Sequence, residues 1–311
     1  MYKRQEEAIV QAGILASQLN KIDESESILD QAFEFPNDSP WKSQALAGSI
    51  SNAYERKDYD RVIAIYDSGQ LTNASESLRP RMFLLVGNAY RIKGDTRSAA
   101  RLYDLVQSSY PETPEGLEAG YRKLQILYQQ GDGSLPTVAR SYISTITQKR
   151  PDDPSIDMAN LMLAEYHFSQ AEKNLQSNTS SAKSNYKSAA VAYSQMGEEK
   201  VPEKFRSLRY YKQGWAYLES GDLPQGVLAI TKFIKRYPDH ALAASALAKR
   251  GGTYQSVEEF TYALRDYQAI IKNYPQSSEL ELAMQQVGFI YAQERDLPKI
   301  CLLYTSPSPR D

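Results

Sequence analysis

Side chains that commonly carry catalysis or bind metals are scarce in this 311-residue chain. It has two histidines, His167 and His240, and one cysteine, Cys301. Neither histidine has a partner at the i, i+4 spacing that a helical metal site uses. Thiolate chemistry needs a cysteine, and zinc sites are usually built from several cysteines or histidines. The one cysteine, Cys301, stands in a terminal stretch that we attribute to a foreign sequence. We therefore interpret both histidines as surface or junction residues and expect no metal ligand.

Other catalytic patterns are missing from the sequence as well. Serines are plentiful, but no Gly-x-Ser-x-Gly elbow occurs. The segment Gly131-Asp132-Gly133 is rich in glycine. It lacks the Gly-Lys-Ser/Thr of a phosphate loop and lies between helical segments, so we interpret it as a turn. The sequence thus predicts no catalytic residue and no cofactor, and we expect a protein that is not an enzyme.

The composition of the chain limits the classes of molecule that it is expected to bind. The chain has 36 basic and 38 acidic residues, a net charge of −2, which argues against a general affinity for nucleic acid or anionic membrane. No apolar run is long enough to span a membrane. The first residues, Met1 to Arg4, lead into a polar amphipathic helix without an apolar signal region. A complete chain of this kind would be cytoplasmic, whereas a fragment could have a signal or lipid anchor upstream.

The helices that would position a functional site are clearest in the sequence between Arg81 and Pro111. Two amphipathic helices are predicted there, joined by a turn at Gly94, which can adopt the left-handed conformation that ends a helix. Asp95 can cap the next helix. The first helix has one apolar face, formed by Met82, Leu85, Val86, Ala89 and Tyr90. The second has another, formed by Ala99, Leu102, Tyr103 and Val106.

This stretch resembles the tetratricopeptide repeat, a helix–turn–helix of about 34 residues. The resemblance is carried by Val86, Gly87, Tyr90, Gly94, Ala99, Tyr103 and Pro111. The tyrosine of the first helix recurs at positions 54, 90, 128, 166, 217, 254 and 291. The fifth copy contains a polar loop over Asn174–Ser181, and the turn of the second copy is expected at Asp58-Tyr59. The resemblance covers nearly all of residues 8–300. It implies an all-α, right-handed α-solenoid over residues 1–300, with seven complete hairpins and half of an eighth.

Three copies end in Tyr-Pro, at Pro111, Pro238 and Pro275. Such repeats are similar to those of bacterial cell-envelope proteins, among them the Tol–Pal-associated periplasmic coordinator and the outer-membrane assembly lipoprotein. This resemblance implies a place in the periplasm or at the outer membrane, with the cytoplasm as the alternative.

The last eleven residues, Cys301–Asp311, resemble the translation of a transposase-end sequencing adapter. They begin where the second helix of a repeat is expected, and their Thr-Ser-Pro-Ser-Pro run cannot continue a helix. We expect the natural sequence to depart from the printed one near Ile300 and the gene product to continue.

The resemblance to tetratricopeptide repeats implies that the first helices line a concave face that binds a protein or an extended peptide. The residues that it places on this face are Arg81, Leu84, Asn88, Arg91, Tyr211, Trp215, Leu218 and Phe289. Trp215 and Phe289 could instead pack against adjacent repeats. A non-enzymatic scaffold is the first hypothesis for function. The alternatives are a targeting arm of an enzyme whose catalytic domain lies outside this sequence, and a solenoid that handles glycans.

Overall fold

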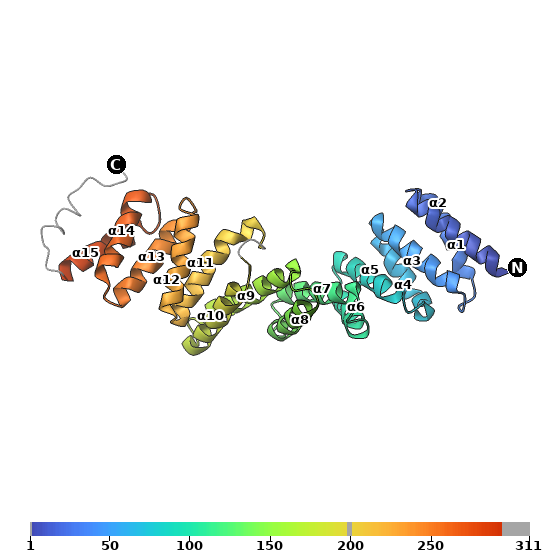
Figure 1. The fold of residues 1–311 in the computed structure, drawn as a ribbon, viewed down its shortest axis with the longest axis horizontal. Helices are drawn as coiled ribbons and strands as arrows, with labels where there is room; N and C mark the ends of the chain where they lie inside the picture. The colour runs from blue at the N-terminus through green and yellow to red at the C-terminus, as the bar shows by residue number, and fades with distance from the viewer. Residues whose placement is uncertain (1, 198–200, 294–311) are drawn as a thin grey trace. The chain divides into compact units, whose positions relative to one another are not determined.

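The computed structural model describes residues 2–197 and 201–293, and every regular element within these ranges is helical (Figure 1). The expected foreign tail, residues 301–311, lies outside the described residues. The α-helices are α1 (Tyr2–Gln18), α2 (Ile22–Leu29), α3 (Pro40–Glu55), α4 (Tyr59–Asp67), α5 (Arg79–Ile92), α6 (Thr96–Ser109), α7 (Pro114–Gln130), α8 (Leu135–Lys149), α9 (Pro154–Asn174), α10 (Thr179–Ser194), α11 (Glu203–Ser220), α12 (Leu223–Arg236), α13 (Ala243–Ser256), α14 (Phe260–Asn273) and α15 (Leu280–Gln293). Two 3₁₀ helices, η1 (Asp30–Glu34) and η2 (Gln70–Asn73), follow α2 and α4.

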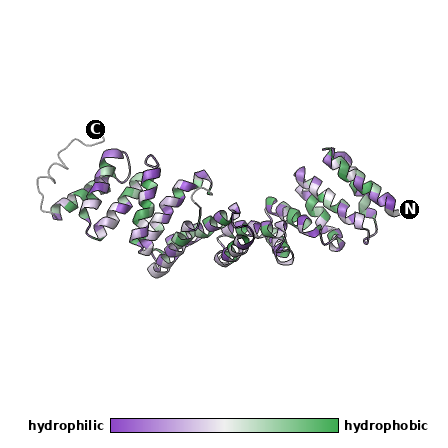
Figure 2. Cartoon of the chain, in the orientation of Figure 1, coloured by the Kyte–Doolittle hydropathy of each residue, from purple (hydrophilic) through white to green (hydrophobic). Residues whose placement is uncertain are grey.

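The chain divides into two compact units, Met1–Tyr142 (unit 1) and Ile143–Asp311 (unit 2). Within unit 1, each helix from α1 to α7 contacts the next, and within unit 2 the same holds from α9 to α15. The first helices of neighbouring hairpins also touch, as α1–α3, α3–α5 and α5–α7 in unit 1 and α11–α13 in unit 2. This solenoid-type stacking confirms the predicted all-α fold class. Apolar and polar residues are interspersed along the helices (Figure 2), and helices such as α6 and α14 bury a single face.

One turn geometry recurs through the hairpins at a fixed spacing. Residues with positive φ stand 37 positions apart at Asn20, Lys57, Gly94 and Gly131 in unit 1, and again at Gly221 and Glu258 in unit 2. The prediction for Gly94 is therefore confirmed. Asp95 also caps α6 as expected, because its side chain accepts a hydrogen bond from the Ser98 N–H at 3.0 Å. In the second hairpin the left-handed residue is Lys57, one position before the expected turn.

Small residues let the two helices of a hairpin approach closely. A Cβ on Gly87 would lie 2.9 Å from Cε1 of Tyr103, and one on Gly251 would lie 3.1 Å from Cε1 of Tyr267. In both pairs the buried ring comes 16 residues after the glycine. Gly87 and Gly251 are therefore points of close approach between the two helices of a hairpin, and Tyr103 and Tyr267 fill the space beside them.

The fifth hairpin, α9–α10, differs from the prediction. The loop spans only residues 175–178 rather than Asn174–Ser181. Asn178 starts α10 early, because its side chain accepts a hydrogen bond from the Ser181 N–H at 3.0 Å. The extra residues of this copy lengthen the helices instead of the loop, so that α9 reaches 21 residues.

Candidate partner-binding surface

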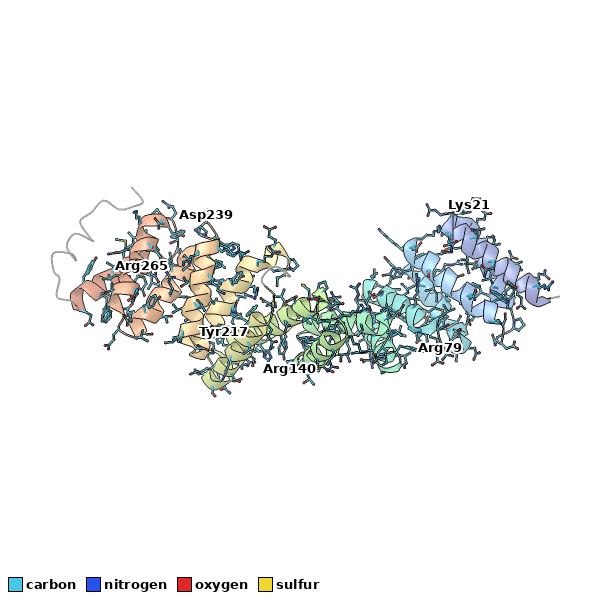
Figure 3. All side chains as sticks on the ribbon, viewed as in Figure 1. Lys21, Arg79, Arg140, Tyr217, Asp239 and Arg265 are labelled. Carbon is cyan, nitrogen blue, oxygen red and sulfur yellow. The ribbon has the colours of Figure 1, made fainter. Side chains whose placement is uncertain are left out.

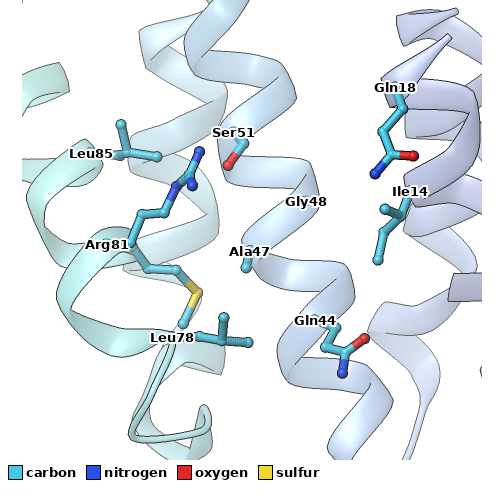
Figure 4. A pocket seen from close by; sticks show the side chains of 10 residues that line it. Ile14, Gln18, Gln44, Ala47, Gly48, Ser51, Leu78, Arg81 and Leu85 are labelled. Carbon is cyan, nitrogen blue, oxygen red and sulfur yellow. The ribbon is translucent and has the colours of Figure 1, made fainter. Parts of the chain in front are cut away.

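The first helices of the three N-terminal hairpins enclose a groove in unit 1, which we call the α1–α3–α5 groove (Figure 4). Its volume is about 450 Å³. The groove is lined by Ile14 and Gln18 of α1, by Gln44, Ala47, Gly48 and Ser51 of α3, and by Leu78, Arg81, Met82 and Leu85 at or next to α5.

Small side chains form the middle of this groove and larger apolar ones form its sides. Ala47, Gly48 and Ser51 present little bulk along α3, while Ile14 and Leu85 face this helix from α1 and α5 (Figure 4). Gly48 also serves the fold, because a Cβ there would lie 2.9 Å from Cδ1 of Leu29 on α2. The arrangement offers apolar contact to a chain segment laid along α3.

The charge of the groove comes from a single side chain. Arg81 is the one charged residue among those that line it, and its side chain is exposed. No hydrogen bond or ion pair joins the Arg81 guanidinium to another residue in the part of the chain that the structure describes. Figure 4 shows this side chain reaching from α5 toward Ser51. The groove therefore combines an apolar surface with one cation that is available to a ligand.

The four residues predicted on α5 do not all lie at the surface. Arg81 lines the groove, and Arg91 is half-buried. Leu84 and Asn88 are each only 6% exposed. Asn88 accepts a hydrogen bond from the Tyr103 hydroxyl at 2.7 Å, and burial raises the pKa of Tyr103 to about 12. The structure thus uses Leu84 and Asn88 to join α5 to α6.

The residues predicted on α11 of unit 2 mostly contact other helices of that unit. Tyr211 is buried, and its hydroxyl lies 2.9 Å from the Ser245 hydroxyl. The Trp215 ring meets Phe168 edge-on at 5.3 Å, and the Lys249 ammonium stands 3.7 Å from its centroid. Trp215 therefore packs against adjacent hairpins, as the alternative interpretation held.

Lys249 itself is held in an unusual setting. Burial lowers the pKa of its ammonium, and the Glu219 carboxylate, 3.9 Å away, opposes that shift. Glu219 also accepts a hydrogen bond from the Trp215 indole N–H at 3.0 Å. The half-buried Leu218 packs on α12, because a Cβ on Gly226 would lie 2.4 Å from its Cδ2. These contacts join α11 to its neighbours.

Phe289 is the predicted residue that stays at the surface of unit 2. It lies on α15 and is 50% exposed. Leu282, on the same helix, is 44% exposed. The role of Phe289 in binding stays a prediction.

Both histidines lie within hydrogen-bonding distance of neighbouring polar groups. His167 is buried and its Nδ1 lies 3.0 Å from Asn185 Oδ1. His240 Nδ1 accepts a hydrogen bond from the Leu242 N–H at 3.1 Å. Over residues 2–197 and 201–293, no three His, Cys, Asp or Glu side chains gather as a metal site would require. Both histidines occupy junctions between helices.

Sequence reasoning missed most of the groove, although one signal pointed to it. Gln44 stands 37 positions before Arg81, and Ile14 stands 37 positions before Ser51. Applying the spacing of the turns to Arg81 would have located its counterpart on α3.

Residues 2–197 and 201–293 contain no helix long and apolar enough to cross a membrane.

Comparison with known families and structures gives one family match, over residues 210–240, to the tetratricopeptide repeat model. No curated protein matches the sequence. Among solved structures, a tetratricopeptide repeat protein from Parabacteroides merdae is 14% identical, with 92% of this chain and 99% of that chain covered and a TM-score of 0.44.

Two further structures are similar to a comparable degree. One is the C-terminal part of a repeat protein of the same kind from Cytophaga hutchinsonii (13% identity, 88% and 98% covered, TM-score 0.45). The other is the TPR2AB domain of yeast Sti1 in complex with pHSP90 (16% identity, 93% and 98% covered, TM-score 0.43). The helical hairpins described above make this an all-α protein, and residues 210–240, in hairpin α11–α12 and the segment after it, match the tetratricopeptide repeat model.

Proposed function

We propose that this chain is a non-enzymatic interaction scaffold and that unit 1 binds a segment of a partner protein in the α1–α3–α5 groove. The observation that carries the proposal is an apolar groove whose one charged lining residue, Arg81, has no partner among the described residues. Tetratricopeptide repeats are known for protein–protein interaction, and stacked repeats present extended binding surfaces.

The composition of the groove indicates what kind of segment it accepts. Ile14, Leu78 and Leu85 offer apolar contact, which favours a segment that buries aliphatic or aromatic side chains. A guanidinium forms strong paired hydrogen bonds with carboxylates. Gln18 and Gln44 can satisfy the polar backbone of an extended chain. A segment with apolar anchors and one acidic residue fits these features.

The test begins by finding the partner through the groove itself. A photo-crosslinking amino acid replaces Gln44 in the groove, and in a second protein it replaces the exposed Arg97 on α6. Both proteins are irradiated in an extract of the native host. We expect a protein that crosslinks at position 44 and not at position 97. Calorimetry with the purified partner then measures affinity.

Arg81→Glu should weaken that affinity at least about tenfold, because it replaces attraction by repulsion at a buried interface. The matched change Arg97→Glu should leave the affinity unchanged. Equal affinities for the Arg81→Glu protein and the parent would refute a role for the groove.

The Tyr-Pro repeats favour a finer role in a bacterial cell-envelope assembly, which we put forward on the sequence resemblance alone. Fractionation of the native host, with an antibody against this chain, tests it. Recovery only with cytoplasmic proteins would contradict the envelope role and leave the scaffold proposal untouched.

A further inference from the structure

A second cavity lies in unit 1, away from the α1–α3–α5 groove, between α4, η2, α5 and α6. We call it the α4–α6 pocket; its volume is about 570 Å³. It exists because α4 stops early. Tyr59 and Thr96, which begin α4 and α6, stand 37 residues apart, yet α4 has 9 residues and α6 has 14. Gly69, with a φ of 75°, ends the helix and turns the chain into η2.

Unit 2 contains the same structural position. A shift of 127 residues takes the bounds of α6 onto those of α12 and the last residue of α4 onto the last residue of α10. The same shift takes Arg79 onto Arg206. Arg79 Nε donates to the Ala74 carbonyl, and Arg206 Nε donates to the Val201 carbonyl, each at 2.8 Å and each five residues back. Arg79 is labelled in Figure 3.

The corresponding cavity in unit 2 is much smaller, about 160 Å³. Four of its lining residues lie 127 positions after four that line the α4–α6 pocket. These pairs are Asp67 and Ser194, Gly69 and Met196, Phe83 and Tyr210, and Leu105 and Lys232. The two cavities are therefore versions of one site.

Arg209 occupies this site in unit 2. Its Nη2 donates to the carbonyls of Tyr193 at 3.1 Å and of Met196 at 2.6 Å, and its Nε also donates to Tyr193. Its guanidinium carbon stands 5.1 Å from the centroid of the Tyr210 ring. Arg209 is 4% exposed. The end of a second helix and the aromatic ring beside it thus form a place that a guanidinium fills.

Unit 1 has no arginine of its own in that position. The residue 127 positions before Arg209 is Met82, which is buried in the apolar core. The pocket keeps the aromatic ring, as Phe83, and Tyr66 stands edge-on to it at 6.2 Å. It also gains a carboxylate, since Asp67 stands where unit 2 has a serine.

The charge at the α4–α6 pocket favours a cation. Asp67 is exposed and uses Oδ1 to accept a hydrogen bond from Tyr90. The C-terminal ends of α4 and α6 add the negative ends of their dipoles. The one cation in the lining, Arg79, has Nε and Nη2 bound to the carbonyls of Ala74 and Thr72. In unit 2 its counterpart, Arg206, is present together with Arg209. Arg79 therefore leaves room for a second guanidinium in the α4–α6 pocket.

We propose that the α4–α6 pocket docks an arginine side chain of a partner protein, in the way that Arg209 fills the equivalent site of unit 2. The guanidinium lies against Phe83 and pairs with Asp67. Arginine suits this place better than lysine, because its flat, weakly hydrated group stacks on aromatic rings and forms paired hydrogen bonds.

The test uses the full chain and a blocked pentapeptide with a central arginine between glycine and serine residues. Methyl NMR spectra follow the signals of Leu71 and Leu105, which line the pocket, and of Leu85 in the groove. We expect saturable shifts at Leu71 and Leu105, with a dissociation constant on the order of 1 mM. Peptides with lysine or leucine at the centre should bind at least about fivefold more weakly.

Two variants make the test specific. Asp67→Asn keeps a hydrogen-bond acceptor for Tyr90 but removes the charge, so it should abolish saturation by the arginine peptide. Asp104→Asn removes a carboxylate of α6 that pairs with Lys123 and does not line the pocket, and binding should persist. Equal binding of the three peptides, binding unchanged by Asp67→Asn, shifts confined to Leu85, or no saturable shift would each overturn the proposal. Because Arg81→Glu lies outside this pocket, the fate of the groove proposal is decided separately.

Discussion

Three residues take a backbone conformation for which glycine is better suited. Asn20, Lys57 and Glu258 have φ values of 59°, 64° and 62° at turns where Gly94, Gly131 and Gly221 serve elsewhere. A side chain in the left-handed region costs about 1–2 kcal/mol because its Cβ crowds the following carbonyl. The turn is set by the spacing of the hairpins, so the residue there must accept the geometry.

Replacing Lys57 by glycine should stabilise unit 1. Lys57→Gly removes the crowded Cβ, and we expect the free energy of unfolding to rise by roughly 0.5–1 kcal/mol after the entropic cost of glycine. Urea denaturation measures the change. Lys57→Ala keeps the Cβ and should bring no gain. A gain for alanine equal to that for glycine would show that loss of the lysine side chain, rather than relief of the backbone, is responsible.

Two glycines of unit 2 should respond to alanine in opposite directions. In Gly214→Ala the new methyl would meet Ile230 Cγ1 at 2.6 Å and its backbone N at 3.0 Å, so unfolding should become about 1–3 kcal/mol easier. In Gly252→Ala the nearest atom is the Tyr267 hydroxyl at 3.7 Å. There the better helix propensity of alanine should add up to about 1 kcal/mol. Denaturation curves that shift in the same direction would contradict this assignment.

At the scale of the elements, two charged side chains hold the end of α10 in unit 2. Arg209 donates to the carbonyls of Tyr193 and Met196. Asp157, on α9, accepts a hydrogen bond from the Gly197 N–H at 2.7 Å. Helix ends leave such groups without partners inside the helix. Two charged side chains from neighbouring helices therefore fix where α10 stops and where α11 packs.

Removing the arginine should loosen this junction. Arg209→Met keeps much of the side-chain volume but leaves buried carbonyls unsatisfied, so we expect a loss of about 2 kcal/mol or more in the free energy of unfolding. Arg265→Met, at an exposed arginine of α14 (labelled in Figure 3), should change it by less than about 0.5 kcal/mol. Hydrogen exchange on α10 and α11 locates the effect. A loss that is no larger for Arg209→Met than for Arg265→Met would contradict the role of Arg209.

At the scale of the whole molecule, tyrosines are the dominant aromatic residue, with 23 in the chain against 8 phenylalanines and 2 tryptophans. Burial raises the pKa of four of them, Tyr90, Tyr103, Tyr186 and Tyr267, to about 12. The hydrogen bond to Asp67 adds to the shift of Tyr90. The folded chain therefore favours the neutral phenol more strongly than the unfolded chain does.

This difference predicts alkaline destabilisation. The contribution of the four tyrosines is fully present below pH 10, near the unfolded pKa, and is lost as the pH rises toward 12. Lys249 acts in the opposite direction. Its pKa in the folded chain is lowered, so keeping it protonated costs folding free energy, and this cost disappears as the pH approaches 10.5. It is one group, however, against four tyrosines. Urea midpoints measured from pH 8 to 12 should fall above pH 10. The tyrosinate absorbance of the folded protein should rise at a higher pH than that of the unfolded chain.

A pair of variants assigns the alkaline effect to burial. Tyr186→Phe removes a phenol that is 1% exposed and should reduce the loss of stability between pH 10 and 12. Tyr262→Phe removes one that is 49% exposed and should not. A flat dependence of the urea midpoint on pH up to 12 would refute the argument.

The sequence by itself determined what is decided within one hairpin. The turn at Gly94 and the cap at Asp95 depend on residues only a few positions apart. Such local geometry follows from backbone preferences and helical periodicity. The all-α class followed from repeating that pattern.

Only the tertiary structure decided which predicted surface residues remain accessible. The register that exposes Arg81 also buries Asn88, because Tyr103 of the next helix reaches it, and Lys249 covers Trp215 from the following hairpin. The α4–α6 pocket likewise depends on the residue at which α4 ends. Contacts of this kind depend on the shapes of side chains in neighbouring helices, and helical periodicity places a residue on a face without saying what covers it.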